Sequence, residues 1–167
     1  MKIFIEEQRM TKPLVIIVLT IVFIGFCISI INKWESISHS NLEDNIVMIS
    51  SLIVLLLVAL IFFNLKLKTR IDEKGVNFQF YPVHFSYRKI SWHEISTCYV
   101  RKYNAIFEYG GWGFRLGITK KIGRAYSVQG NIGLQLELKN GKKILIGTQK
   151  KEDIQRVIDN YSTKITN

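Results

Sequence analysis

Cysteine and acidic residues are scarce in this chain. Of 167 residues, two are cysteines, and 13 Asp and Glu stand against 23 Lys and Arg, which gives a net charge of +10. Cys27 and Cys98 have no second cysteine in CxxC spacing, so the sequence excludes a disulfide framework. We interpret both thiols as small apolar side chains. The basic balance favours an anionic partner.

Histidines are also few, and their scatter argues against an enzyme. His93-Glu94 begins like the zinc motif HExxH, but Thr97 stands where the second histidine would be. The other two histidines, His39 and His84, are scattered, and His39 is expected on the opposite side of the membrane. No GxSxG nucleophile motif or paired-carboxylate pattern is present. We therefore predict a protein that is not an enzyme and that uses no cofactor and no metal.

The chain contains two long apolar runs without charged residues. Residues 14–31 and 46–63 each contain 18 residues with no Asp, Glu, Lys, Arg or His, and 14 of each are Leu, Ile, Val or Phe. Those side chains give each run roughly −4 to −8 kcal/mol of insertion free energy. Two membrane-spanning helices are therefore predicted. The alternatives are a core helix pair and, for the first run, a cleaved signal peptide, against which its length argues.

Basic residues flank the two runs unevenly, and this predicts their orientation. The loop between the runs, 32–45, carries Lys33 against three acidic residues. Basic residues are concentrated outside it, before the first run at Lys2, Arg9 and Lys12 and after the second at Lys66, Lys68 and Arg70. Because cytoplasmic flanks are rich in Lys and Arg, we expect both termini in the cytoplasm, the loop outside, and Trp34 at the outer interface.

The excess of positive charge lies in the second part of the chain. Residues 66–167 hold 19 Lys and Arg against 8 Asp and Glu, whereas residues 1–65 hold 4 against 5. We therefore divide the chain into an N-terminal tail with a membrane hairpin, 1–65, and a cytoplasmic domain, 66–167. Anionic lipids of the inner leaflet are the nearest partner, at about 1 kcal/mol for each basic residue near them. The alternatives are a solvated basic surface and, ranked last, nucleic-acid binding, which needs converging basic and aromatic residues.

The cytoplasmic part has the alternation and turns of a β domain. Apolar Val76, Phe78 and Phe80 alternate with polar neighbours, and a turn at 72–75 separates this run from the run at 65–71. Further strands are predicted at 84–90, 95–103, 125–129, 134–138 and 143–146, the last two joined by the hairpin turn Asn140-Gly141.

An amphipathic helix is predicted at the end of the domain. Thr148 has the position of an N-cap residue. The apolar residues that follow have helical spacing and form one stripe: Ile154, Val157, Ile158 and Tyr161. This stripe must be buried, and we expect it to cover the open end of a small barrel.

The stretch Ile90-Ser91-Trp92-His93-Glu94-Ile95 resembles the I-x-W-x-[DE]-I pattern of bacterial pleckstrin-homology-like (PH-like) domains. Residues 109–115, 123–126 and 130–148 continue the resemblance, which covers roughly 69–161. It implies a transmembrane α-hairpin followed by a mainly-β PH-like barrel of about seven strands, capped by a C-terminal helix. It further implies a multi-pass protein of the bacterial cytoplasmic membrane, and it implies no particular biochemical activity.

One glycine-rich segment, 109–117, has the composition of a ligand loop. Its glycines would let backbone N–H groups approach a phosphate, but no Gly-Lys-[Ser/Thr] of a Walker loop follows. Glycines between strands also form bulges and barrel corners, so both interpretations stay open. The predicted contacts to an anionic ligand or lipid are basic residues of this region and of the segment after the second run: Arg115, Lys120, Lys121, Arg124, Lys66, Lys68 and Arg70.

Together these features predict a non-enzymatic, membrane-anchored interaction module. Its PH-like domain would bind an unidentified protein partner or the anionic inner leaflet. The alternative is a structural subunit or assembly factor of a membrane complex that acts through its transmembrane hairpin. The two differ in whether the cytoplasmic domain, fused to an unrelated anchor, keeps the function.

Overall fold

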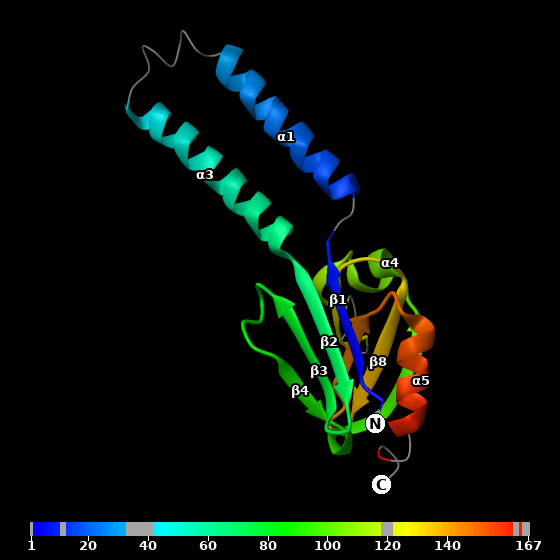
Figure 1. Ribbon diagram of the computed structural model, residues 1–167. Helices are drawn as coiled ribbons and strands as arrows, with labels where there is room; N and C mark the ends of the chain where they lie inside the picture. The colour runs from blue at the N-terminus through cyan, green and yellow to red at the C-terminus, as the bar shows by residue number, and fades with distance from the viewer. Residues whose placement is uncertain (1, 11–12, 33–41, 118–121, 162–163, 165–167) are drawn as a thin grey trace. The chain divides into compact units, whose positions relative to one another are not determined.

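The computed structural model describes residues 2–10, 13–32, 42–117, 122–161 and 164. These residues belong to two compact units (Figure 1). Unit 1 comprises Met1–Met10 and Leu65–Asn167, and unit 2 comprises Thr11–Asn64. Trp34, Lys120 and Lys121, which the sequence analysis singled out, lie outside the described residues.

Unit 2 contains two apolar helices, α1 (Pro13–Asn32) and α3 (Leu42–Asn64). Their hydroxyl side chains bond back to their own helix, as Thr20 Oγ1 does to the carbonyl of Ile16 at 2.8 Å. The segment Asn45–Asn64 is long and apolar enough to cross a membrane, with a mean hydropathy of 3.2, and none of its apolar window is buried. Ile16–Asn32 is a shorter apolar helix. The structure therefore supports one candidate span by length and composition.

The first strand of unit 1 was missed by the sequence analysis. β1 (Phe4–Arg9) pairs antiparallel with β2 (Lys66–Asp72), from Phe4↔Ile71 to Arg9↔Lys66. The first ten residues, placed with the helices in the 1–65 division, thus fold with residues 65–167 instead. Apolar alternation did not reveal β1, because two of its three buried side chains are polar, Glu6 and Gln8.

Four antiparallel strands in chain order form the first sheet, called sheet A: β1, β2, β3 (Gly75–Tyr81) and β4 (Arg88–Ser91). The predicted turn at 72–75 is confirmed, since Asp72 pairs with Gly75 and the Asp72 carboxylate accepts a hydrogen bond from Lys74 N at 3.0 Å. The strand predicted at 84–90 is shorter than expected and begins only at Arg88.

The second sheet, sheet B, has the strand order β5-β8-β9-β7-β6. Its strands are β5 (Ile95–Lys102), β6 (Gly113–Leu116), β7 (Arg124–Ser127), β8 (Ile132–Leu138) and β9 (Lys143–Gly147), with the short helix α4 (Ala105–Tyr109) between β5 and β6. The predicted Asn140-Gly141 turn joins β8 to β9, and Gly141 has a φ of 78°. β7 and β9 run parallel, and the other pairs are antiparallel.

The closed barrel of about seven strands was a wrong expectation. The described residues form nine strands in two sheets that share no strand pairing. On one side, side-chain hydrogen bonds from β1 connect the two sheets in place of backbone strand pairing. Gln8 Nε2 donates to the carbonyl of Gly147 at 2.8 Å, and the Glu6 carboxylate accepts from Thr148 Oγ1 at 2.7 Å and from Gln149 N at 2.9 Å. On the other side, a cleft lined by basic residues opens between β4 and β7, and β7 already pairs with β9 and β6 on its two edges.

The predicted C-terminal helix is confirmed as α5 (Lys151–Tyr161), which begins three residues after Thr148. All four apolar residues of its predicted stripe are buried in the core of unit 1. Tyr161 stacks on Trp92 with a centroid distance of 5.3 Å, and Trp92 Nε1 donates to the carbonyl of Asp72 at 2.9 Å. The Ile90–Ile95 motif is therefore structural, since its apolar residues Ile90, Trp92 and Ile95 are all buried.

Candidate functional site

The basic residues predicted to contact an anion do not gather at one place. Lys66, Lys68 and Arg70 lie along β2, Arg115 lies on β6, and Arg124 begins β7. Arg115 is exposed, and its Nε donates to the carbonyl of Trp112 at 3.2 Å. The structure therefore separates the predicted set into a sheet A group and a sheet B group.

The β2 group lies on the outer face of sheet A. Its members alternate with the buried residues of β2 and share this face with Arg9 and Glu7 of β1. Glu7 pairs with Arg9 at 3.3 Å and with Lys68 at 3.7 Å, and Asp72 pairs with Arg70 at 3.1 Å. Because the cations of these pairs are exposed, each pair is worth at most about 1 kcal/mol, and the face keeps a net positive charge.

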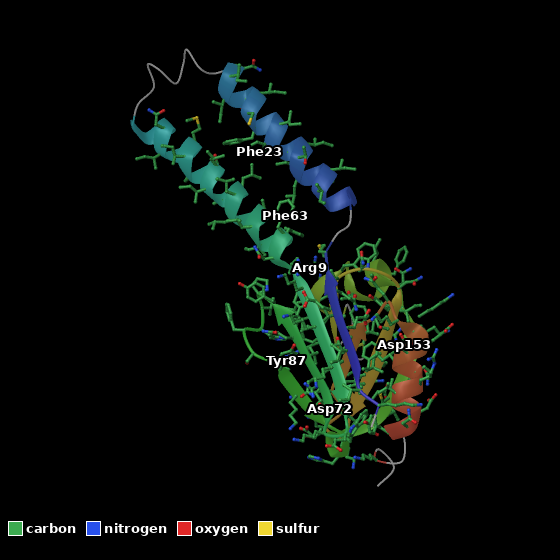
Figure 2. The ribbon with its side chains drawn as sticks, in the orientation of Figure 1. Arg9, Phe23, Phe63, Asp72, Tyr87 and Asp153 are labelled. Atoms are coloured by element: carbon green, nitrogen blue, oxygen red, sulfur yellow. The ribbon has the colours of Figure 1, made fainter. Side chains whose placement is uncertain are left out.

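One end of unit 1, the proximal end, is defined by Met10 and Leu65, where the chain leaves for the helices and returns. Met10 N donates to the carbonyl of Leu65 at 3.2 Å. The last rung of sheet A lies beside them and contains Arg9, Lys66 and Tyr81 as cross-strand neighbours. Figure 2 shows Arg9 and Asp72 at opposite ends of the sheet.

A loop with exposed apolar side chains follows Tyr81 at the proximal end. Phe85 is 82% exposed and contacts Tyr81 edge-on with a centroid distance of 6.0 Å. Val83 and Tyr87 of the same loop are also exposed. Exposed aromatic and apolar residues beside cations are typical of surfaces that contact a membrane interface.

A cleft of about 470 Å³ opens between β4 of sheet A and the strands β7 and β9 of sheet B. We call it the basic cleft, because five cationic residues line it: Arg88, Lys89, Arg124, Lys142 and Lys143. No acidic residue is among the described residues that line it. Of these five residues, Lys143 is the one that forms an ion pair in the described part of the chain, with Glu137 at 2.7 Å.

Strand register directs Arg88 and Arg124 to the basic cleft, whereas Lys89, opposite Asn77, and Lys143, opposite Glu137, leave their strands on the other faces of the two sheets. Arg88 lies opposite Phe78, whose ring is buried between the sheets, so the Arg88 side chain leaves β4 toward that same face. Arg124 pairs with Ile144 across the parallel strands β7 and β9. Gly123 allows this approach, because its φ is +84° and a Cβ there would lie 2.2 Å from the carbonyl oxygen of Lys143.

The basic cleft extends toward the distal end of unit 1, away from Met10 and Leu65. Lys139, next to the Asn140-Gly141 turn, donates its backbone N–H to the carbonyl of Glu94 at 2.9 Å. Glu94 in turn lies two residues from Trp92, whose indole is bonded to Asp72 at the far end of β2. The cleft therefore reaches the distal end, while the loop after Tyr81 leads into Arg88 and packs its His84 on the cleft rings Phe78 and Tyr126.

Aromatic rings form the inner wall of the basic cleft. Tyr126 contacts Phe78, Phe114 and His84 at centroid distances of 4.8, 5.1 and 5.2 Å. His84 is buried, and its Nδ1 has no hydrogen-bond partner among the described residues. Burial and, secondarily, the charge of Arg88 lower the pKa of His84, so the ring is neutral at pH 7.

Acidification is expected to destabilise unit 1 through His84. In the unfolded chain the histidine titrates near pH 6.5, and its pKa is lower in the folded state, so the unfolded state binds more protons below about pH 6.5. Stability should therefore be full above that pH and fall as the pH drops toward the folded-state pKa. Thermal unfolding of a joined domain, in which an Asn-Gly turn replaces residues 11–64, measures this effect. His84→Phe should flatten the dependence between about pH 7 and pH 5, and an unchanged slope would contradict it.

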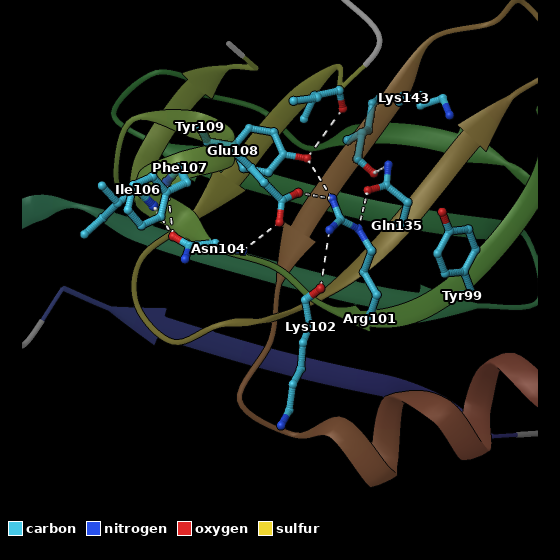
Figure 3. A network of polar contacts seen from close by, with 12 residues as sticks. Tyr99, Arg101, Lys102, Asn104, Ile106, Phe107, Glu108, Tyr109, Gln135 and Lys143 are labelled. Atoms are coloured by element: carbon cyan, nitrogen blue, oxygen red, sulfur yellow. Dashed lines mark hydrogen bonds and ion pairs between the residues drawn. The ribbon is translucent and has the colours of Figure 1, made fainter. Parts of the chain in front are cut away.

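A second polar cluster, around Arg101, is structural (Figure 3). Arg101 pairs with Glu108 of α4 at 2.8 Å and donates to Tyr109 Oη at 3.3 Å and to Gln135 Oε1 at 3.1 Å. Burial disfavours the charge of Glu108, but the hydrogen bonds from Arg101 and from Asn104 N outweigh it and lower the pKa of Glu108. The cluster fastens α4 to sheet B.

The glycine-rich segment also has structural roles. Gly110 ends α4 in the left-handed conformation, with a φ of 72°, and its N–H bonds to the carbonyl of Ile106 at 2.8 Å. Gly117 N donates to the carbonyl of Gly123 at 2.6 Å and so closes the β6–β7 connection. These observations favour the corner interpretation over a phosphate-cradling loop.

Neither the cysteines nor the His93-Glu94 pair forms a catalytic arrangement in the described part of the chain. Cys27 and Cys98 are both free, and burial raises the pKa of Cys98 to about 12, so its thiol stays protonated. Glu94 accepts a hydrogen bond from Ser91 N at 2.8 Å and thereby caps a short 3₁₀ turn. The absence of enzymatic activity stays a prediction.

The sequence analysis singled out Arg124 of the cleft cations as a site residue and missed Arg88 and Lys142. No local signal marks these residues, since they converge only when β4 meets β7 and β9. Comparisons with protein-family models, with curated proteins and with solved structures give no match to this chain.

Proposed function

We propose that this protein is a membrane-anchored interaction module whose unit 1 lies at the inner surface of the bilayer. The observation that carries the proposal is the hydrogen-bonded contact between Met10 and Leu65, which places both connections to the apolar helices at one end of one folded unit. The PH-like resemblance of residues 69–161 is consistent with such a module, and the function is a binding one rather than an enzymatic one.

The pairing of β1 with β2 supports two membrane crossings instead of one. If α3 alone crossed the bilayer, Met10 and Leu65 would lie on opposite sides, and the ladder from Phe4 to Arg9 would not form. A crossing by α3 therefore requires a return crossing by α1. Its 20 residues span about 30 Å, which equals the hydrocarbon thickness. The positive-inside rule then favours the cytoplasm for unit 1.

The proximal end has the chemistry of a surface that faces the inner leaflet. Lys66 and Arg9 supply cations beside the point where the chain meets lipid, and Tyr81 and Phe85 supply amphipathic and apolar rings. Each basic residue near anionic lipid contributes about 1 kcal/mol, so these contacts orient the domain and the helices anchor it.

Flotation of the joined domain with vesicles tests the leaflet contact. We expect binding to vesicles of phosphatidylcholine with phosphatidylglycerol, little binding to phosphatidylcholine alone, and loss of binding as salt rises. Phe85→Ser and Arg9→Gln/Lys66→Gln should each weaken binding about threefold or more, because they remove a ring and two charges from the surface.

Matched controls lie elsewhere on unit 1. Leu116→Ser removes an exposed apolar side chain from β6, and Lys150→Gln/Lys151→Gln removes two charges beside α5. Both should bind like the unaltered domain. No flotation even at low salt would rule out leaflet binding and leave a protein partner as the ligand of the module.

A role of the hairpin as an assembly element is the second candidate. A cavity of about 180 Å³ between α1 and α3 is lined by apolar side chains that include Phe23 and Phe63. Another transmembrane helix could pack its side chains into this cavity. Replacement of 11–64 by an unrelated two-helix anchor distinguishes the candidates, since it preserves the function of a module and abolishes that of an assembly element.

A further inference from the structure

We propose that the basic cleft binds a small phosphate-bearing anion. This inference does not depend on the leaflet contact. The cations of the cleft that carry the inference come from three parts of the chain: Arg88 of β4, Arg124 of β7 and Lys142 of the β8–β9 hairpin.

The charge of the cleft is not compensated within unit 1. Arg88, Arg124 and Lys142 form no ion pair in the described part of the chain, and the one ion pair among the lining cations, Lys143 with Glu137, lies on the other face of sheet B. Like charges around one cavity repel, more strongly near low-dielectric walls than in water. Phe78 and Tyr126 supply such a wall, since their side chains are almost completely buried. A bound anion would remove this repulsion.

The kind of anion follows from the shape and the donors. A volume of about 470 Å³ is the size of a small-molecule site and too small for a nucleic-acid duplex or a folded protein. Two arginines at opposite walls, Arg88 and Arg124, offer planar forks that match phosphate oxygens bidentately, and Lys142 adds a point charge. The aromatic rings are buried under the cleft and offer no open face for a base to stack on.

A phosphate group reaches the cleft from either of two sources, a soluble phosphorylated compound or a lipid headgroup. The cleft extends toward the distal end of unit 1, opposite the connections to α1 and α3. This position favours the soluble source, and the experiment separates the two.

Titration calorimetry of the full chain in nanodiscs, with inorganic tripolyphosphate as the probe, tests the proposal. In phosphatidylcholine nanodiscs the unaltered chain should bind, and Arg88→Gln/Arg124→Gln should lose about tenfold or more in affinity, because both bidentate donors are gone. Lys102→Gln/Lys151→Gln removes the same charge from exposed positions outside the cleft and should bind within about twofold of the unaltered chain.

Thermal unfolding distinguishes a ligand site from a structural role of the two arginines. Tripolyphosphate should raise the Tm of the unaltered chain and leave that of Arg88→Gln/Arg124→Gln unchanged. Without the probe, the variant should be as stable as the unaltered chain or more stable, since repulsion is relieved. Should the double variant fail to fold, Lys142→Gln on the exposed turn repeats the test and should weaken binding.

A second set of nanodiscs that contain phosphatidylglycerol identifies the source of the phosphate. Weaker tripolyphosphate binding in these nanodiscs shows that lipid headgroups occupy the cleft, and unchanged binding shows a soluble ligand. Failure of the unaltered chain to bind the probe in phosphatidylcholine nanodiscs would overturn the proposal. Equal losses in the cleft variant and the control variant would also overturn it, because binding would then reflect overall charge alone.

Discussion

Removal of β1 is expected to unfold the rest of unit 1. A fragment of residues 65–167 should show no cooperative unfolding transition, whereas the joined domain, which keeps residues 1–10, should unfold cooperatively in urea. The two differ only in β1 and its turn. The comparison therefore measures what the first ten residues contribute to the cytoplasmic domain.

The magnitude follows from what β1 buries and bonds. Phe4 is 3% exposed, and its burial is worth about 2 kcal/mol. Glu6 and Gln8 make three hydrogen bonds to residues 147–149, at about 1 kcal/mol each, and their loss leaves buried donors unpaired. The total of about 5 kcal/mol is comparable to the whole stability of a small domain.

Two further results sharpen this prediction. Glu6→Ala in the joined domain should cost about 2 kcal/mol, because it leaves the Thr148 hydroxyl and the Gln149 N–H without their acceptor. Glu7→Ala, one residue away on the exposed face, should cost less than about 0.5 kcal/mol. A 65–167 fragment as stable as the joined domain would show that β1 is dispensable.

The elements that the sequence predicted correctly carry a periodic pattern of their own. Alternation of apolar and polar residues predicts the strands around Val76 and Leu136. Turn residues predict the turns at 72–75 and 140–141, and helical spacing predicts the apolar stripe of α5. β1 lacks such a pattern, because its inward residues Glu6 and Gln8 are polar and bond to a segment about 140 residues away. Only the folded chain brings those partners together.

The candidate site was less predictable than the fold for the same reason. Arg124 was singled out, but its partner across the cleft, Arg88, lies in a segment read only as a strand. The count of charged residues predicted a basic domain, but it did not predict where in the fold the charges converge. Convergence depends on how the two sheets pack against each other, and neither composition nor periodicity predicts which strands meet across that packing.

Truncation of Tyr126 should have the largest effect of any single substitution in the core beside the basic cleft. Tyr126 is 1% exposed and contacts four rings, those of Phe78, Phe80, His84 and Phe114. Tyr126→Ala removes the wall that both sheets share, and large-to-small substitutions of this kind cost about 3–5 kcal/mol. Urea unfolding of the joined domain, followed by circular dichroism, measures the loss.

Tyr126→Phe is the matched control, since it keeps the ring and removes only the hydroxyl. We expect it to change stability by less than about 1 kcal/mol and to retain tripolyphosphate binding within about twofold, because the arginines and lysines supply the donors. A loss of several kcal/mol in Tyr126→Phe would mean that the hydroxyl, and not ring packing, holds the two sheets together. If ring packing holds the sheets together, Tyr126→Ala should lose much more stability than Tyr126→Phe, and the cleft should stay intact in Tyr126→Phe.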